Sequence, residues 1–195
     1  MTDLIPGQRE AAPYAPPHDL EAEMAVLGAM LLSRDAIGEV LEVVSGGHFY
    51  RPAHATVFAT IVTLYLRGDA ADPITVAAEL TKTGEIARAG GAPYLHELVQ
   101  ATSTVANAEQ YALIVRERAA LRDVITVNLT AANQAMRGEG TASEIIATQQ
   151  QALQAVYDDT GDDGLDLLGP HWTSSTTTTT AAPPAPARSA ESPPA

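Results

Sequence analysis

Apolar side chains recur at spacings of three and four residues between about residues 16 and 158, with capping residues, prolines and glycines between the segments. The expected helix starts in the first part of the chain are Asp19, Ser33, Pro52, Asp72-Pro73 and Pro93. Glycines at 46–47, 68 and 84 are expected to end the helices that precede them. No stretch shows the sustained alternation of a strand, so the predicted fold class is all-α, beginning with a small helical bundle.

The segment from Asn107 to about Gly138 predicts one long helix, with Asn107 as a suitable N-cap. Thr141 and Glu144 form a capping-box pattern at the start of a further helix that reaches about residue 157. Two long helices joined by a turn of only a few residues run antiparallel. The sequence therefore predicts that a long antiparallel helical hairpin follows the bundle.

The first hairpin helix is more apolar than an ordinary surface helix. At about 100° per residue, its apolar side chains spread over roughly two-thirds of the circumference, whereas packing on one side needs only about 100°. The second hairpin helix covers one stripe, and a second copy of the chain is the natural cover for the rest. The predicted interface consists of Tyr111, Ile114, Glu117, Arg118, Leu121, Arg122, Ile125 and Leu129. Charged members of this set must be paired if the interface buries them.

Both ends of the chain differ in composition from its centre. We predict a flexible N-terminal arm at residues 1–15, a globular helical bundle at 16–103 and a helical hairpin at 104–158. Residues 159–195 form an acidic and then Thr/Ala/Pro-rich tail, which lacks the apolar content needed to offset the entropy of ordering. Within it, 162-DDGLDLLGPHW-172 fits either a short docking peptide anchored by Trp172 or a linker remnant, with the linker favoured.

Composition excludes several classes of function. The chain has no cysteine and a formal net charge of −13, with ten arginines and a single lysine. Nucleic-acid surfaces need Lys or Arg opposite phosphates, so we expect protein partners and no direct DNA binding by the isolated chain. No apolar run approaches the roughly 20 residues that span a membrane, and the N-terminus lacks a signal-peptide pattern. The expected location is the cytoplasm, without membrane attachment.

Residues that carry chemistry are sparse. Glu21 and Glu23 point to different sides of a helix, so they are interpreted as acids that favour the helix dipole and not as a catalytic pair. The five histidines lack the i, i+4 spacing of a zinc site, and a hydrogen-bonded structural role is favoured for them, His54 included. We therefore expect no catalytic residues, no metal site and no cofactor.

Five segments together resemble a known family. They are 16-PPHDLEAEMAVLG-28, Phe49-Tyr50 followed by His54 and Phe58, 73-PIT-75, 90-GGAPYLHEL-98 and 107-NAEQYALIVRERAALR-122. In order and spacing they resemble the N-terminal domain of bacterial DnaB-type replicative DNA helicases. The resemblance implies a helical bundle followed by a hairpin, pairing of domains through their hairpins, and a ring collar of three dimers. It also implies a role in hexamer assembly and in docking primase.

The sequence departs from complete helicases of this type, which continue into a motor domain with the P-loop G-x-x-x-x-G-K-[ST]. The only lysine is Lys82, with Thr81 and Val76 at the positions of the two required glycines. We therefore expect no ATPase and no enzyme activity. The expected function is in DNA replication, through self-association as a dimer or hexameric ring and docking of primase or a full-length helicase. The alternatives are a truncated subunit of an ATP-dependent helicase, or a scaffold that has lost the replication role.

Overall fold

A computed structural model describes residues 15–160, which form seven α-helices and two short 3₁₀ turns, with no strand in that range. The elements in chain order are α1 (Leu20–Leu32), α2 (Arg34–Val43), η1 (Gly46–His48), α3 (Pro52–Arg67), α4 (Pro73–Lys82), α5 (Ala92–Ala101), η2 (Val105–Asn107), α6 (Ala108–Arg137) and α7 (Ala142–Thr160). The predicted all-α class is confirmed. Most of the predicted N-terminal arm and of the C-terminal tail, with the segment around Trp172, lies outside the described residues.

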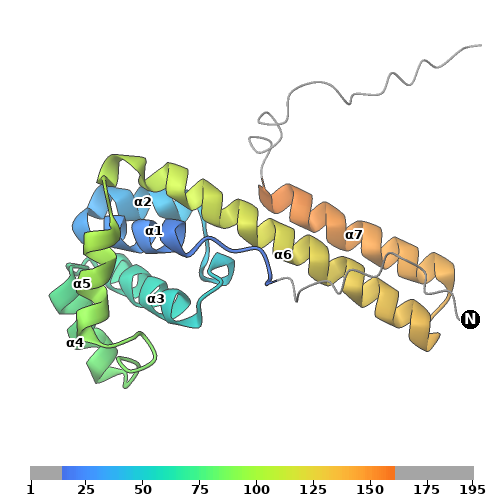
Figure 1. The fold of residues 1–195 in the computed structure, drawn as a ribbon, viewed down its shortest axis with the longest axis horizontal. Helices are drawn as coiled ribbons and strands as arrows, with labels where there is room; N and C mark the ends of the chain where they lie inside the picture. The colour runs from blue at the N-terminus through green and yellow to red at the C-terminus, as the bar shows by residue number, and fades with distance from the viewer. Residues whose placement is uncertain (1–14, 161–195) are drawn as a thin grey trace, which may run out of the picture. The chain divides into compact units, whose positions relative to one another are not determined.

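Helix α1 is the centre of the bundle. It packs against α2, α3 and α5 and against the first half of α6 (Figure 1). Because neighbours cover it on several sides, it is apolar around most of its circumference, as expected for a buried helix. Val26, Leu27 and Met30 are fully buried there, together with Ile61 from α3 and Leu98 from α5.

The predicted caps of α1, α2 and α4 are confirmed. The Asp19 carboxylate accepts the Ala22 N–H at 3.0 Å, and the Ser33 hydroxyl accepts the Ala36 N–H at 3.4 Å. Asp72 accepts the backbone N–H groups of residues 74 and 75 ahead of the proline-started helix. Each cap satisfies a donor that the first helical turn leaves without a partner, which fixes where the helix begins.

Two local predictions are wrong. Helix α2 ends at Val43 with Val44 in an extended conformation, and Gly46-Gly47 open the 3₁₀ turn η1, so these glycines do not form the helix stop. Asn107 precedes α6 as expected, but its side chain makes no capping hydrogen bond.

Helices α1 and α5 approach each other closely at Gly28. A Cβ atom built on this glycine would lie 2.2 Å from the Leu98 carbonyl oxygen and 2.0 Å from the Thr102 hydroxyl oxygen. That hydroxyl donates to the carbonyls of Ala25 and Leu98, and so joins the two helices. The residue has to be glycine for steric reasons, because the neighbouring atoms are largely backbone.

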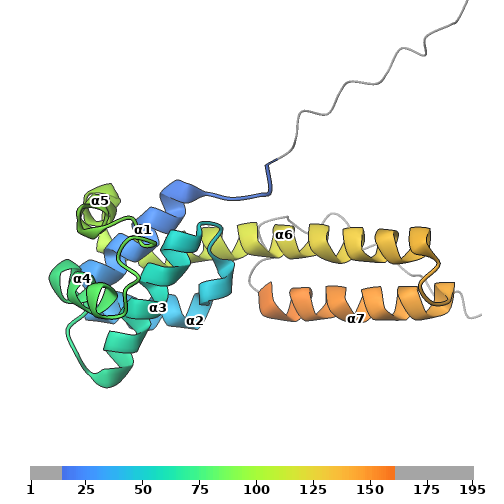
Figure 2. The same cartoon turned by 90° about the horizontal axis from the view of Figure 1, so that it is seen from below.

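Helices α6 and α7 form the predicted antiparallel hairpin (Figures 1 and 2). Gly138 ends α6 with φ of +66°, a left-handed conformation that glycine adopts without strain. The capping box is also confirmed, since the Thr141 N–H donates to the Glu144 carboxylate at 2.7 Å and the Glu144 N–H donates to the Thr141 hydroxyl at 3.3 Å. The first half of α6 lies on the bundle, and its second half lies beside α7 (Figure 2).

Candidate interaction surface on the helical hairpin

Large apolar side chains on α6 remain exposed after the chain has folded. Ile114 and Leu121 are 38% exposed, Ile125 is 45%, Leu129 is 58% and Met136 is 77% exposed. At about 100° per residue these five positions fall within an arc of about 80°. We call this set the α6 stripe. Single exposed apolar residues are ordinary, whereas a continuous row along one helix indicates an interaction surface.

The other sides of α6 pack against the bundle and against α7. The residues that α6 buries are Ala108, Ala112, Val115 and Ala119, all in its first half, where it packs on α1 and α2. In the second half the half-buried positions are Val127, Ala131 and Gln134, beside α7. Neither neighbour buries the residues of the α6 stripe. Helix α7 adds the exposed side chains of Ile146 and Tyr157 to the hairpin surface.

The eight residues of the predicted interface do not share one environment. Ile114, Leu121, Ile125 and Leu129 belong to the α6 stripe. Tyr111 is half-buried and packs against the core of the bundle. The remaining three are charged: Glu117 is exposed, Arg118 is half-buried, and Arg122 is engaged within its own chain.

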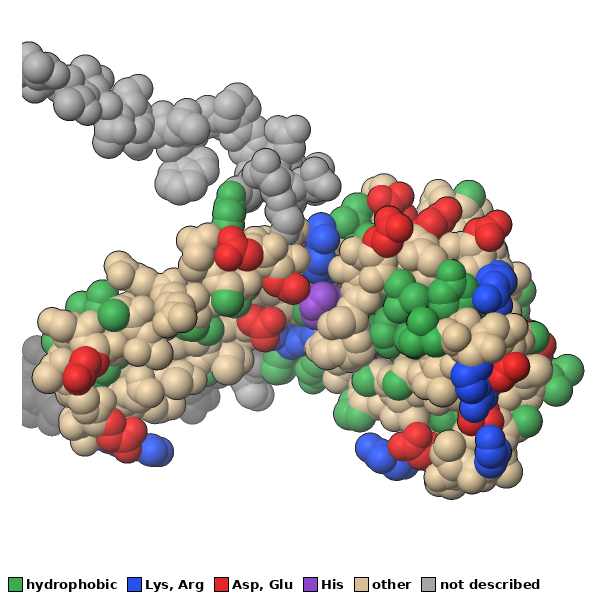
Figure 3. All heavy atoms as spheres, turned by 180° about the vertical axis from the view of Figure 1, so that it is seen from behind, with side chains coloured by type: hydrophobic (Ala, Val, Ile, Leu, Met, Phe, Trp, Pro, Cys, Tyr) green, Lys and Arg blue, Asp and Glu red, His purple; other side chains and the backbone are tan. Residues whose placement is uncertain are grey.

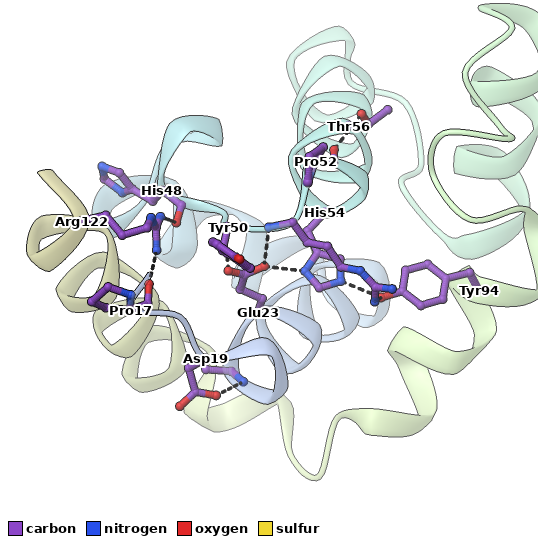
Figure 4. A network of polar contacts seen from close by, with 12 residues as sticks. Pro17, Asp19, Glu23, His48, Tyr50, Pro52, His54, Thr56, Tyr94 and Arg122 are labelled. Carbon is purple, nitrogen blue, oxygen red and sulfur yellow. Dashed lines mark hydrogen bonds and ion pairs between the residues drawn. The ribbon is translucent and has the colours of Figure 1, made fainter. Parts of the chain in front are cut away.

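Arg122 makes the most specific contacts of the set. Its Nη1 donates to the Pro17 carbonyl at 2.9 Å and its Nη2 donates to the His48 carbonyl at 2.6 Å (Figure 4). The guanidinium also lies over the Tyr50 ring, 5.8 Å from its centroid, and that ring stacks on His18 at 4.3 Å. The sequence analysis placed Arg122 among the charged members of the predicted interface, but the sequence gave no sign that its acceptors lie in segments 74 and 105 residues away.

A second polar network runs through the bundle around Glu23 and His54, which are 1% and 0% exposed (Figure 4). One Glu23 oxygen lies 2.6 Å from His54 Nδ1, and the other accepts the Tyr50 N–H at 2.7 Å. His54 Nε2 lies 2.6 Å from the Tyr94 hydroxyl, which accepts from Arg51 Nη1 at 3.0 Å. Burial raises the pKa of Tyr94, and the positive charge of Arg51 opposes that rise.

One assignment of hydrogens satisfies this whole network. Arg51 has only donors, so the Tyr94 hydroxyl accepts from it and donates its own proton to His54 Nε2. His54 Nδ1–H then donates to the Glu23 carboxylate. No buried side-chain nitrogen or oxygen lacks a partner among the described residues. The hydrogen-bonded structural role predicted for His54 is confirmed.

The sequence interpretation missed the role of Glu23. Glu21 is exposed near the helix start, as expected for an acid that favours the dipole, but Glu23 is a buried hydrogen-bond acceptor. A local signal was available, because Glu23 lies beside Ala22 and one turn before Val26 and Leu27, on the buried side of α1. Its partners, 27 to 31 residues further along the chain, could not be identified from that pattern.

The described residues hold no group of three or more metal-binding side chains, and no helix within residues 15–160 is long and apolar enough to cross a bilayer. On the face shown in Figure 3, a patch of hydrophobic side chains lies over the bundle with charged side chains around it, and the charged side chains of the hairpin lie mainly near its two ends. The fold defines an all-helical domain in which a small bundle is followed by an antiparallel hairpin with an exposed apolar stripe.

Residues 15–117 match the model of the family described as "DnaB-like helicase N terminal domain". The chain belongs to this family, and the resemblance seen in five sequence segments is confirmed.

Over 150 residues the chain is 43% identical to the replicative DNA helicase DnaB of Leifsonia xyli subsp. xyli (strain CTCB07), a match that covers 77% of this chain and 33% of that protein. Over 143 residues it is 46% identical to the replicative DNA helicase DnaB of Mycobacterium leprae (strain TN), covering 73% of this chain and 24% of that protein. The chain therefore spans a third or less of the length of these relatives.

Solved structures agree with this assignment. The crystal structure of the N-terminal domain of DnaB helicase from Mycobacterium tuberculosis is 45% identical, with a TM-score of 0.67, and the match covers 72% of this chain and 99% of that one. A structure described as a DnaB-like replicative helicase and its interactions with primase shares the fold, with a TM-score of 0.60 at 20% identity, over 71% of this chain and 31% of that one. The region matched here is the N-terminal domain of such helicases.

Proposed function

We propose that this chain acts in DNA replication in the cytoplasm through protein contacts alone. It self-associates through its hairpin and docks a replication protein, either primase or a replicative helicase, and it has no ATPase of its own. The observation that carries this proposal is the α6 stripe, a row of large apolar side chains that neither α7 nor the bundle covers. Burying these side chains in an interface would remove apolar surface from water, at about 25 cal/mol for each Å².

A second copy of the chain is the occupant that fits the stripe best. From Ile114 to Met136 the stripe is about 33 Å long at 1.5 Å per residue, and Arg118 is the one charged side chain within its arc. A stripe of this kind is self-complementary, so two copies can pair by a twofold axis that presents the same surface from each. Glu117 lies on one flank of the stripe and Arg118 lies within its arc, and these opposite charges can pair between two copies across such an interface.

Two observations support a role in replication. The relatives are named as replicative DNA helicases, and a structural neighbour is described together with primase.

The net charge of −13 favours protein partners over direct contact with DNA phosphates. The sequence contains no G-x-x-x-x-G-K-[ST] motif, which supports a role without nucleotide hydrolysis.

Light-scattering mass after size exclusion, across a dilution series, tests self-association. We expect a dimer, or a hexamer built from dimers, for the wild-type chain. Leu121→Asp or Ile125→Asp places a charge in the stripe and should shift the mass to that of the monomer of 20.4 kDa. Leu66→Asp is the matched control, because Leu66 is 75% exposed on α3, outside the hairpin, and should leave the mass unchanged.

If both hairpin variants kept the wild-type mass, the α6 stripe would not be the self-association surface. Far-UV circular dichroism establishes that each variant remains helical. Docking is tested separately, with purified primase and purified replicative helicase as probes in surface plasmon resonance. Binding of neither would favour a scaffold that has lost the replication role, even if the chain were a dimer.

A further inference from the structure

Helix α6 extends well beyond the bundle that supports it. The last residue it buries is Ala119, while the helix continues to Arg137 with α7 as its neighbour. Because only its first half packs on the bundle, the direction of α6 relative to the bundle depends on the contacts nearest the point where α6 leaves the bundle. Those contacts lie within one turn of Ala119.

Arg122 lies at that point, three residues beyond Ala119. Its guanidinium joins α6 to two other segments, the Pro17 carbonyl just before α1 and the His48 carbonyl at the end of η1. The planar guanidinium presents several donors in a fixed geometry, so one side chain holds both carbonyls at once. The ammonium of a lysine lacks this geometry and could not be expected to hold both.

The second hairpin helix is tied to the same turn. His48 Nε2 lies 3.2 Å from the Asp159 carboxylate, near the end of α7. His48 Nδ1 accepts the Ser45 N–H at 3.2 Å, so Nε2 carries the proton that points to Asp159. Both α6 and α7 are therefore connected to η1, by the carbonyl and the ring of one residue.

The segment directly after η1 is itself fixed in the bundle. Directly after η1, the Tyr50 and Arg51 N–H groups donate to the buried Glu23 carboxylate at 2.7 and 3.4 Å. The Phe49 ring packs on Phe58 of α3, with the centroids 5.1 Å apart. Figure 4 shows Arg122 and the Glu23 network on the two sides of this segment. Polar contacts from the hairpin to η1 therefore connect the hairpin to the core of the bundle.

We propose that Arg122 is a positioning residue that, together with the His48–Asp159 pair, fixes the direction of the hairpin relative to the bundle. It acts inside one chain, and it thereby sets the orientation in which the α6 stripe meets a partner. This last step rests on the proposed self-association. The part of α6 from Arg122 to Arg137 is about 22 Å long, so a change of about 20° in its direction would move its C-terminal end by about 8 Å. That displacement exceeds one helical turn and would misalign the apolar side chains of a paired stripe.

Distances between two spin labels test this directly, because the chain has no cysteine of its own. Cysteines replace the exposed Ala59 on α3 and Ala135 near the end of α6, and both carry the label. Labelled protein is diluted with excess unlabelled protein of the same variant, so that only distances within one chain are measured. The wild-type chain should give one narrow distance distribution.

Arg122→Ala and Arg122→Lys should each broaden that distribution by several ångström, since lysine cannot hold both carbonyls. Asp159→Asn should broaden it less. Arg118→Ala is the matched control, because Arg118 is a half-buried arginine on the same helix with no hydrogen bond or ion pair within the described residues. Its distribution should equal that of the wild type. If Arg122→Ala proves unfolded, Arg122→Lys and Asp159→Asn decide the question.

A narrow, unshifted distribution of label distances in the folded Arg122 variants would overturn the proposal. If these variants also failed to self-associate, Arg122 would act between chains and not within one. Failure of the proposed function has a different signature. In that case Leu121→Asp leaves the mass unchanged, while the Arg122 variants still broaden the distance within the chain. The two ideas can therefore be refuted independently.

Discussion

The contact at Gly28 predicts a large effect from the smallest possible substitution. Gly28→Ala adds one methyl group in the middle of α1, where the Cβ would lie 2.2 Å from the Leu98 carbonyl oxygen and 2.8 Å from its carbon. Real Cβ atoms essentially never approach other heavy atoms within 3.0 Å. The backbone of α5 cannot rotate away as a side chain would, so the two helices have to separate.

The size of the effect follows from two opposing contributions. Replacing a helical glycine by alanine favours the helix by about 1 kcal/mol. Overpacking a well-packed core costs about 1–3 kcal/mol, and more where rigid backbone is displaced. The displacement here is about 1 Å, and it also disturbs the Thr102 hydroxyl, which joins α1 to α5. With the cost at or above the upper end of that range, we expect a net loss of about 2 kcal/mol or more, a large share of the 5–15 kcal/mol typical of a domain.

Urea denaturation followed by far-UV circular dichroism measures this loss. The comparison is made in a Leu121→Asp background at fixed protein concentration, because association would add to apparent stability. Gly38→Ala in α2 is the matched control, since its Cβ would meet only the Tyr65 hydroxyl oxygen, at an ordinary 3.5 Å. This control should gain about 0.5–1 kcal/mol. Equal midpoints for Gly28→Ala and the parent would refute the reasoning.

Two further predictions concern the polar groups. Glu23→Ala should cost about 3 kcal/mol or more, because it leaves the buried His54 Nδ1–H and Tyr50 N–H without an acceptor; urea midpoints measure the loss, and wild-type stability would contradict it. The Thr141 N–H lowers the pKa of Glu144, so the stabilisation of the first turn of α7 is complete above the ordinary pKa near 4.5 and is lost as the pH falls through the lowered value. Protection of the hairpin-turn amides against exchange, relative to their intrinsic exchange rates at the same pH, should therefore fall in acid in the wild type but not in Glu144→Gln, and an equal fall in both would show that another group titrates.

Features encoded within a few residues of each other were predictable. The left-handed end of α6 at Gly138 and the capping box of Thr141 and Glu144 each depend on local geometry, and the structure has both. The start of α4 at Asp72-Pro73 follows in the same way from a cap and a proline. Each of these signals determines where a helix begins or ends, and the order of helices follows from them.

Features that depend on distant segments were not predictable. The bundle-facing side of α6 is mostly alanine, at 108, 112 and 119, and small side chains contribute little to an apolar pattern. Similarly, an acid in the first turn of α1 looks like a dipole partner until His54 is brought 2.6 Å from it by the packing of α3 on α1. Arg122 was grouped with Glu117 and Arg118 by position alone, while its actual acceptors are carbonyls on other segments.

The acceptors of Arg122 are backbone oxygens, and every amino acid carries one. A change of side chain at position 17 leaves an oxygen for the guanidinium, provided the chain keeps its path, whereas a change at 122 removes both bonds at once. For these two hydrogen bonds the identity of the side chain therefore matters at Arg122, the donor, and much less at the two acceptors. Saturation mutagenesis would show an intolerant position at 122 facing a permissive one at 17.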